Sequence, residues 1–197
     1  MNCLDAMSQI PRLGRLEIEK KAQELLDLYF DGSFPVNIES VCDYLGLAIM
    51  PVRGLKGYFG VDAFIAADFK TIYVDEVGFR AGTNRYRFSL AHEIGHFVLH
   101  REYFPNRIES LEEWIGSSAY SGRNYVEYQA NYFAGCLLAP EDELIWMLNT
   151  MYDGNFARNY YRVEQRNHTK VLTKMRRWFM VSEQVMTRRM QDVVYGL

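Results

Sequence analysis

Hydrophobic residues follow two different spacings in the first part of the chain. Residues 16–30 and 38–45 place apolar side chains three and four positions apart, and a glycine follows each segment. This spacing predicts two amphipathic helices. Glycines separate three later apolar runs, and the middle run has apolar residues at every second position. They predict short strands of a small antiparallel sheet over residues 47–52, 58–66 and 71–75.

Helix signals dominate the rest of the chain. Thr83 or Asn84 can cap a helix that reaches about His100, and Ser182 can cap the last helix. Pro140 is followed by three acidic residues, a strong helix start. The predicted fold class is therefore α+β. We expect helices over about 84–100, 124–138, from 140 onward, 168–179 and 182–194.

Composition indicates a soluble cytoplasmic protein. Hydrophobic residues make up 49% of the 197 positions and charged residues 24%, which is ordinary for a globular chain. No stretch approaches the roughly 20 apolar residues of a membrane span, and no secretion signal is visible at the start. The three cysteines are widely spaced without a C-x-x-C pair, so we expect reduced thiols rather than disulfides or a cysteine zinc site.

Charge is distributed unevenly along the chain. The net charge is −3, yet residues 158–192 hold nine Lys and Arg against three Asp and Glu, a local balance of +6. A basic segment of this kind can bind nucleic acid, but it is more often a solvated helix face. We therefore favour the solvated face over direct nucleic-acid binding.

The nine residues from His92 to His100, H-E-I-G-H-F-V-L-H, contain three of the four histidines. On a helix, His92 and His96 lie on one face with Cβ atoms about 6 Å apart. His-Glu-x-x-His on a helix is the pattern in which two histidines bind zinc and the glutamate acts as general base. The other helix faces are apolar, so Glu93 is expected to be buried, and a bound metal would stabilise such a carboxylate.

A third ligand must come from elsewhere. His100 shares the polar face but lies about 12 Å along the axis from His92, too far to join a zinc site with ligand distances of about 2 Å. We expect it to pack or to support the ligands. The metzincin pattern is also excluded, because Leu99 and Glu102 stand where it requires glycine and histidine.

Glu127 is the best placed candidate for the third ligand, and Asn131 could orient it. Small residues in both helices, such as Gly95 and Ala130, would allow a close approach. In the alternative interpretation Glu127 closes a capping box with Asn124. Other acidic or histidine residues remain possible substitutes: Glu102, Glu109, Glu112, Glu113 and His168.

Three segments read R-F-S-L-A-H-E-I-G-H at residues 87–96, E-Y-Q-A-N-Y-F-A at 127–134 and L-L-A-P at 137–140. On these segments the chain resembles the ImmA/IrrE family of metallo-endopeptidases, and the resemblance extends over roughly residues 17–145. It implies a zincin-like core, in which a small sheet packs on the H-E-x-x-H helix beside a second metal-binding helix. Residues 1–150 would form this metallopeptidase-like domain, and residues 151–197 a basic helical extension packed on it.

The same resemblance implies the roles of four residues. His92, His96 and Glu127 would bind Zn²⁺, and Glu93 would be the catalytic base. The expected function is a zinc-dependent endopeptidase whose protein substrate is a regulator such as a helix-turn-helix repressor. The alternative is a non-catalytic zinc-containing module that binds a repressor or toxin partner.

Further expectations concern the substrate. The strand predicted at residues 58–66 could hold an extended peptide by edge pairing. A donor to the oxyanion is also expected, and the candidates are Tyr120, Tyr125 and His168.

Overall fold

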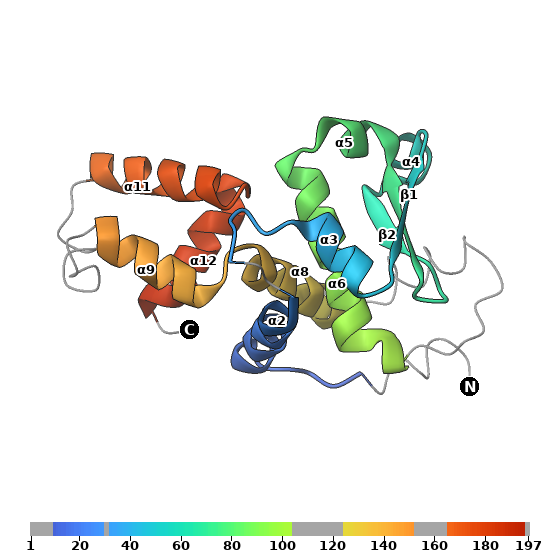
Figure 1. The fold of residues 1–197 in the computed structure, drawn as a ribbon, viewed down its shortest axis with the longest axis horizontal. Coiled ribbons are helices and arrows are strands. Elements are labelled where there is room, and N and C mark those ends of the chain that lie inside the picture. Colours follow the sequence, from blue (N-terminus) through green and yellow to red (C-terminus); the bar gives the residue numbers. More distant parts are fainter. Residues whose placement is uncertain (1–9, 30–31, 104–123, 152–164, 196–197) are drawn as a thin grey trace.

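The computed structural model describes residues 10–29, 32–103, 124–151 and 165–195. A small sheet and two short helices, α4 and α5, lie at one end of the molecule (Figure 1). The helices α9, α11 and α12 lie at the other end, and α6 and α8 pass through the middle. This mixture of helices with one small sheet confirms the α+β class.

The sheet has the strand order β1-β3-β2 and is mixed rather than antiparallel. β1 (Ala48–Val52) runs parallel to β3 (Thr71–Asp75), and β2 (Ala63–Ile65) runs antiparallel to β3. The prediction of a wholly antiparallel sheet is therefore wrong for the β1–β3 pair. The chain reverses twice between β1 and β3, so it enters β3 in the direction of β1, with β2 on the outer side.

The strand predicted at residues 58–66 is also shorter than expected. Tyr58 and Phe59 belong to the helix α4 (Leu55–Phe59), and only residues 63–65 form β2. Gly54 and Gly60 flank α4 with φ angles of 74° and 75°, a conformation that glycine adopts without strain. These two glycines begin and end a short helix that takes up the first two residues of the run whose alternation suggested a strand.

The helices of the first half match the predicted segments, with one addition. α2 spans Arg15–Tyr29 and α3 spans Ile38–Tyr44. The unpredicted α5 (Glu76–Ala81) follows β3 directly, capped by the side chain of Asp75. α6 spans Asn84–His100, and the Thr83 hydroxyl accepts a hydrogen bond from the Tyr86 N–H at 3.2 Å, so Thr83 is the cap. A 3-10 turn, η1 (Arg101–Tyr103), follows.

The second half contains four described helices. They are α8 (Asn124–Leu138), α9 (Glu141–Met151), α11 (Gln165–Trp178) and α12 (Glu183–Tyr195). The Ser182 hydroxyl accepts from the Val185 N–H at 3.2 Å, which confirms Ser182 as the cap of α12. Within the described ranges, no helix combines the length and apolar character needed to cross a membrane.

α6 and α8 approach each other closely at Gly95. A Cβ atom added to Gly95 would lie 3.1 Å from both the Cα and the carbonyl oxygen of Ala130. The small residues therefore allow the backbones to touch, as the sequence predicted. This contact fixes the separation of the two helices that carry the candidate metal ligands.

A partly buried ionic network holds α12 against α2 and the residue that follows α8. The Arg189 side chain is 3% exposed; it donates to Glu19 of α2 and, at 3.1 Å, to the carbonyl oxygen of Ala139. Asp192 lies 3.7 Å from Arg189 and 3.4 Å from Arg15. A buried arginine needs such partners, because an unpaired buried charge is costly. The first and last described helices are therefore joined directly.

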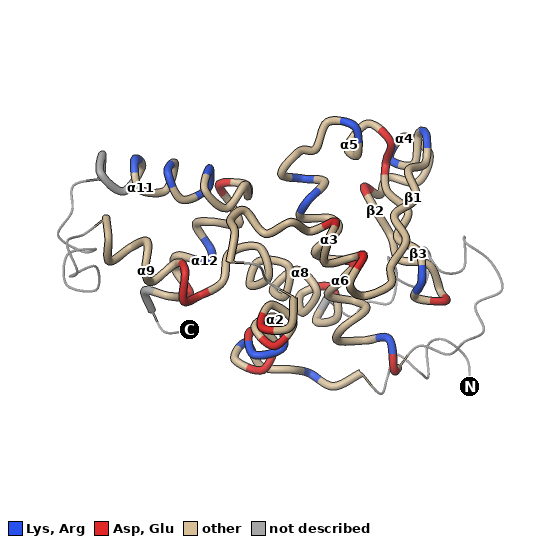
Figure 2. Tube along the Cα trace, viewed as in Figure 1, with Lys and Arg blue, Asp and Glu red and all other residues tan. Residues whose placement is uncertain are grey.

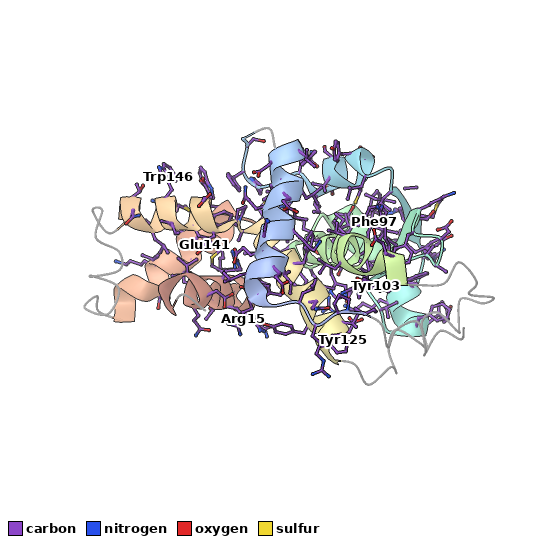
Figure 3. All side chains as sticks on the ribbon, turned by 90° about the horizontal axis from the view of Figure 1, so that it is seen from below. Arg15, Phe97, Tyr103, Tyr125, Glu141 and Trp146 are labelled. Atoms are coloured by element: carbon purple, nitrogen blue, oxygen red, sulfur yellow. The ribbon has the colours of Figure 1, made fainter. Side chains whose placement is uncertain are left out.

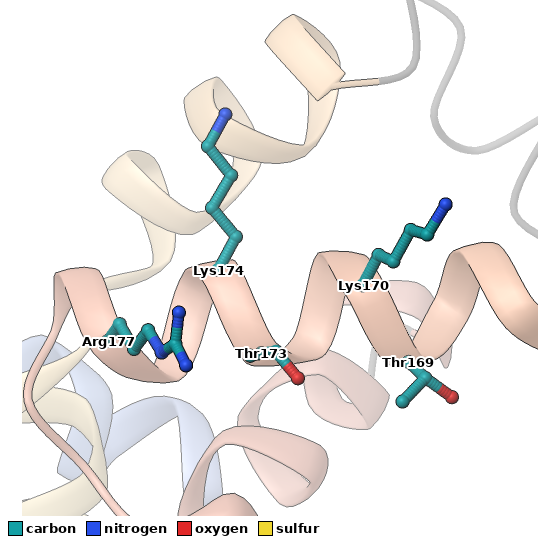
Figure 4. A pocket seen from close by; sticks show the side chains of 5 residues that line it. All are labelled: Thr169, Lys170, Thr173, Lys174 and Arg177. Atoms are coloured by element: carbon teal, nitrogen blue, oxygen red, sulfur yellow. The ribbon is translucent and has the colours of Figure 1, made fainter.

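The basic residues of the C-terminal part gather on α11 (Figure 2). Lys170, Lys174 and Arg177 line a surface cavity of about 460 Å³ together with Thr169 and Thr173 (Figure 4). Lys170, Lys174 and Arg177 are all exposed, as expected for a solvated helix face. On the neighbouring helix α9, Trp146 also projects outward and is 57% exposed (Figure 3).

Candidate metal centre

Three side chains converge between α6 and α8. The Nε2 atoms of His92 and His96 lie 3.0 Å apart. The Glu127 carboxylate places one oxygen 3.2 Å from the His92 Nε2 and the other 3.4 Å from the His96 Nε2. One ligand atom from each residue can be chosen so that all three lie within 4.8 Å of one another. The structure thus brings together the three residues that the sequence singled out.

The spacing and chemistry of these donors are compatible with a metal ion. Ligands about 2.0–2.1 Å from a tetrahedral zinc ion are separated from one another by about 3.3 Å, close to the observed donor separations of 3.0, 3.2 and 3.4 Å. Two imidazoles and a carboxylate also form a donor set that occurs at catalytic zinc sites. The Glu127 side chain is 43% exposed, so the site can be reached from solvent.

The electrostatics of the site favour an ionised Glu127. Burial favours the neutral acid, but the hydrogen-bonding histidines His92 and His96 hold the pKa of Glu127 well below its usual range. A negative carboxylate is the form that binds a metal ion. Both of its oxygens face imidazole nitrogens, so Glu127 is directed toward the histidines and not back toward its own helix start, as a capping box would require.

Asn131 orients a histidine rather than Glu127. Its Oδ1 lies 3.1 Å from the His92 Nδ1, the ring nitrogen that faces away from the candidate ligands. The expectation that Asn131 would support Glu127 is therefore wrong. Glu127 and Asn131 lie one turn apart on α8, and both reach across to α6, one to each side of the same imidazole ring.

His100 lies outside the group of three donors but contacts it. Its Nδ1 is 3.0 Å from the Nδ1 of His96, and its Nε2 is 3.1 Å from the Oε1 of Gln129. The residue is fully buried. Burial and the neighbouring His96 lower the pKa of His100 to about 3. His100 is therefore a neutral imidazole held between two polar partners.

Glu93 is buried beside the three donors and is bonded to the sheet. It is 7% exposed, and one carboxylate oxygen, Oε2, accepts a hydrogen bond from the backbone N–H of Ile65 at 2.8 Å. Residues 62 and 66 pair with β3 through hydrogen bonds at 2.8 and 2.7 Å, and these bonds alternate along an antiparallel ladder. The N–H groups of Ala63 and Ile65 consequently point to the opposite edge of β2, where Glu93 lies.

A comparison with known protein families matches residues 61–191 to the family described as Peptidase_M78, the IrrE N-terminal-like domain. The chain belongs to this family. The match confirms the resemblance inferred from the sequence and makes a metallopeptidase-type function the coarse assignment for the IrrE-like domain. No curated protein matches the chain.

The IrrE-like domain has room for a ligand beside Glu127. A cavity of about 690 Å³ is lined by residues of α6, α8 and α12. Glu127 and Asn131 form part of its wall, together with the aromatic rings of Phe88 and Tyr128. The candidate metal ligands are therefore continuous with a space large enough for several side chains of a bound peptide.

Two further site candidates from the sequence, Tyr125 and Glu102, lie in the described residues and do not join this group. The Tyr125 hydroxyl donates to the carbonyl oxygen of Ile10 at 3.2 Å, and Glu102 is exposed on η1. Other candidates lie outside the described residues, or have side chains that do: Tyr120, Glu109, Glu112, Glu113 and His168. Sequence reasoning missed two contacts, the Ile65 N–H on Glu93 and Gln129 on His100, because neither follows from a motif.

Proposed function

We propose that this IrrE-like domain is a zinc-dependent endopeptidase. The observation that supports the proposal is the convergence of His92, His96 and Glu127 beside a buried Glu93 in a member of a peptidase family. Three protein ligands leave a position open for water and substrate, which distinguishes a catalytic zinc site from a closed structural one.

Each of the four residues has a role in this proposal. His92, His96 and Glu127 hold the ion. The chemistry that zinc supplies when bound is Lewis acidity, which brings the pKa of water towards about 7 and polarises a carbonyl group. Glu93 accepts a proton from the attacking water and passes it to the leaving amine. The Ile65 N–H donates to Oε2 of Glu93 and orients the carboxylate, whose oxygens keep lone pairs that can take the proton.

The substrate is proposed to be a protein, bound in part by the edge of β2. This strand is an outer strand of the sheet, and its outward edge borders Glu93. An extended peptide that pairs with this edge at Ala63, beside the Ile65 N–H that Glu93 occupies, would carry its backbone past the candidate metal ligands. Following the family resemblance, we further propose that the substrate is a transcriptional repressor of the helix-turn-helix class. We also propose that residues 151–197 form an extension packed on the catalytic part.

Cleavage of candidate repressors tests the proposal. Purified protein loaded with zinc is incubated with repressors encoded beside its gene, and fragments are identified by mass spectrometry. Glu93→Gln should still bind zinc and yield no fragments, since an amide cannot act as the base. Glu102→Gln is the matched control, because this exposed residue lies on η1, outside the candidate site, and the variant should cleave as the wild type does.

If the protein is instead a non-catalytic module, the same experiment should give the opposite result. Wild type and Glu93→Gln would then alter DNA binding by the repressor equally, and neither would produce fragments. That result would reject the peptidase proposal.

A separate measurement tests Glu127 as a ligand. Zinc content should fall sharply in Glu127→Ala and stay unchanged in Glu102→Ala. Full zinc content in Glu127→Ala would show that Glu127 does not bind the ion.

A further inference from the structure

A chain of hydrogen-bonding groups runs from His96 to the N-terminal segment. The His96 Nδ1 lies 3.0 Å from the Nδ1 of His100, and the His100 Nε2 lies 3.1 Å from the Oε1 of Gln129. Gln129 donates through Nε2 to the carbonyl oxygen of Pro11 at 3.0 Å. His100 is 0% and Gln129 1% exposed, so water does not compete for these groups.

The two ends of this chain of groups, the relay, fix the direction of the hydrogen bonds in it. The Pro11 carbonyl can only accept, so the amide nitrogen of Gln129 must face it. The amide oxygen of Gln129 then faces His100 and can also only accept, so the His100 Nε2 carries a proton. An imidazole that binds an ion through Nε2 carries its proton on Nδ1. The Nδ1–H of such a His96 faces the His100 Nδ1 at 3.0 Å, so the His100 Nδ1 accepts the hydrogen bond.

The position of this proton determines whether the other ring nitrogen of His96, Nε2, can bind a metal ion. A neutral imidazole with its proton on Nδ1 has a free lone pair on Nε2. That nitrogen lies 3.0 Å from the His92 Nε2 and 3.4 Å from Glu127. We propose that His100 and Gln129 are positioning residues that hold His96 in the Nδ1–H tautomer, with its Nε2 lone pair directed to the metal. This inference rests on the metal site of the proposed function.

The final acceptor of the relay belongs to neither ligand-bearing helix. Pro11 lies in the segment before α2, and this segment is attached to the first turns of α8 by further contacts. The Tyr125 hydroxyl donates to the Ile10 carbonyl at 3.2 Å, and the Arg12 guanidinium lies 5.0 Å from the centre of the Tyr125 ring. Docking of residues 10–12 on α8 therefore sets the tautomer of a ligand on α6, through two buried side chains.

Tautomers can be observed directly by nuclear magnetic resonance. The full-length protein, labelled with ¹⁵N in its histidines and loaded with zinc, is examined through long-range proton–nitrogen correlations. The expected spectra show an Nδ1–H tautomer for His96 and an Nε2–H tautomer for His100. An Nε2–H tautomer of His96, or a doubly protonated His100 near neutral pH, would overturn the proposal.

Zinc affinity provides the second test. Gln129→Met fills the same space but cannot accept from His100, so we expect the Kd for zinc to rise about 10–100-fold, the usual effect of losing such a supporting group. Gln129→Glu should weaken zinc binding as well, because a carboxylate cannot donate to the Pro11 carbonyl and would favour a charged His100 whose Nδ1–H points at His96. Affinities are measured by competition with a chromophoric chelator.

Val126→Ala is the matched control for loosened packing. Val126 is 6% exposed on α8 and packs against Ile10, but it has no polar group in the relay. Its zinc affinity should match the wild type. A methionine or glutamate variant that binds zinc as tightly as the wild type would reject the positioning role. The spectra of the wild type decide the question independently if Gln129→Met fails to fold.

These measurements also separate this inference from the peptidase proposal. Tautomers and zinc affinity need no substrate and no turnover. A protein with the expected tautomers and variant affinities that cleaves nothing would retain the relay and lose the peptidase assignment. A protein that cleaves its substrate while His96 has the opposite tautomer would retain the function and lose the relay.

Discussion

Replacing Gly95 by alanine tests whether the contact between α6 and α8 holds the candidate ligands together. The new Cβ would lie 3.1 Å from two backbone atoms of Ala130 and 3.3 Å from the ring of Phe133. Carbon atoms pack best about 3.5–4.0 Å apart, and backbone atoms cannot rotate away. The gain in helix propensity is about 1 kcal/mol, whereas overpacking costs about 1–3 kcal/mol. The net effect should be destabilising by up to about 2 kcal/mol.

Gly135→Ala is the matched control, because it lies on α8 where the added Cβ meets only the Arg189 side chain, at 3.4 and 3.7 Å. The propensity gain is common to both variants and cancels in the comparison. Gly95→Ala should therefore unfold in urea with a free energy about 1–3 kcal/mol lower than Gly135→Ala, at an equal m value. Equal stability within about 0.5 kcal/mol would refute the packing argument.

The same pair of variants connects packing to the metal centre. Glu127 lies about one turn before Ala130 on α8, so a displacement of α8 away from α6 also moves the Glu127 carboxylate away from His92 and His96. Zinc affinity should fall in Gly95→Ala and stay at the wild-type value in Gly135→Ala. An unchanged affinity in the destabilised variant would show that the ligands adjust independently of the helix contact.

Three further predictions concern the rest of the fold. Thr83→Ala removes the cap of α6 and should lower the free energy of unfolding by about 1 kcal/mol in urea titrations, and an unchanged value would contradict the cap. Burial raises the pKa of the Asp62 carboxyl group, but hydrogen bonds from Arg85 and Lys56 outweigh burial and lower this pKa overall. The stabilising effect of Asp62, measured against Asp62→Asn, should be full at pH 7 and shrink as the pH falls below about 4. Burial raises the pKa of Cys42 to about 12 and that of Cys136 as well, so in a Cys3→Ser background a thiol reagent should label neither until the protein is unfolded.

Local sequence signals predicted the parts of the site that lie on one helix or depend on residue size. The four-residue spacing of His92 and His96 determines that they share a face of α6, and the Thr83 hydroxyl determines where that helix begins. The small residues Gly95 and Ala130 indicated a close helix pair. These properties follow from helix geometry and side-chain volume, so one sequence is enough to derive them.

The errors arose where a contact depends on how distant elements dock. The parallel pairing of β1 with β3 follows from the path of the chain through α4 and β2, which alternation cannot encode. Asn131 was expected to support Glu127 because the two are neighbours on α8, but its partner His92 lies on the other helix. The bond from Ile65 to Glu93 uses a backbone N–H, which every residue except proline has, so no residue type signals it.

The buried pair of Glu19 and Arg189 has a consequence for synthesis of the protein on the ribosome. The two residues are 170 positions apart in the chain, so at roughly 5–20 residues per second about 10–30 seconds separate their translation. Because α8 ends at Leu138, α2 and α8 can meet only in the last part of this interval, about 3–10 seconds before Arg189 is made, while the surface of α8 that α12 covers is exposed to water. The metal centre can thus be assembled on the nascent chain before α12 packs on it, and this unfinished intermediate is the species that chaperones and proteases would meet.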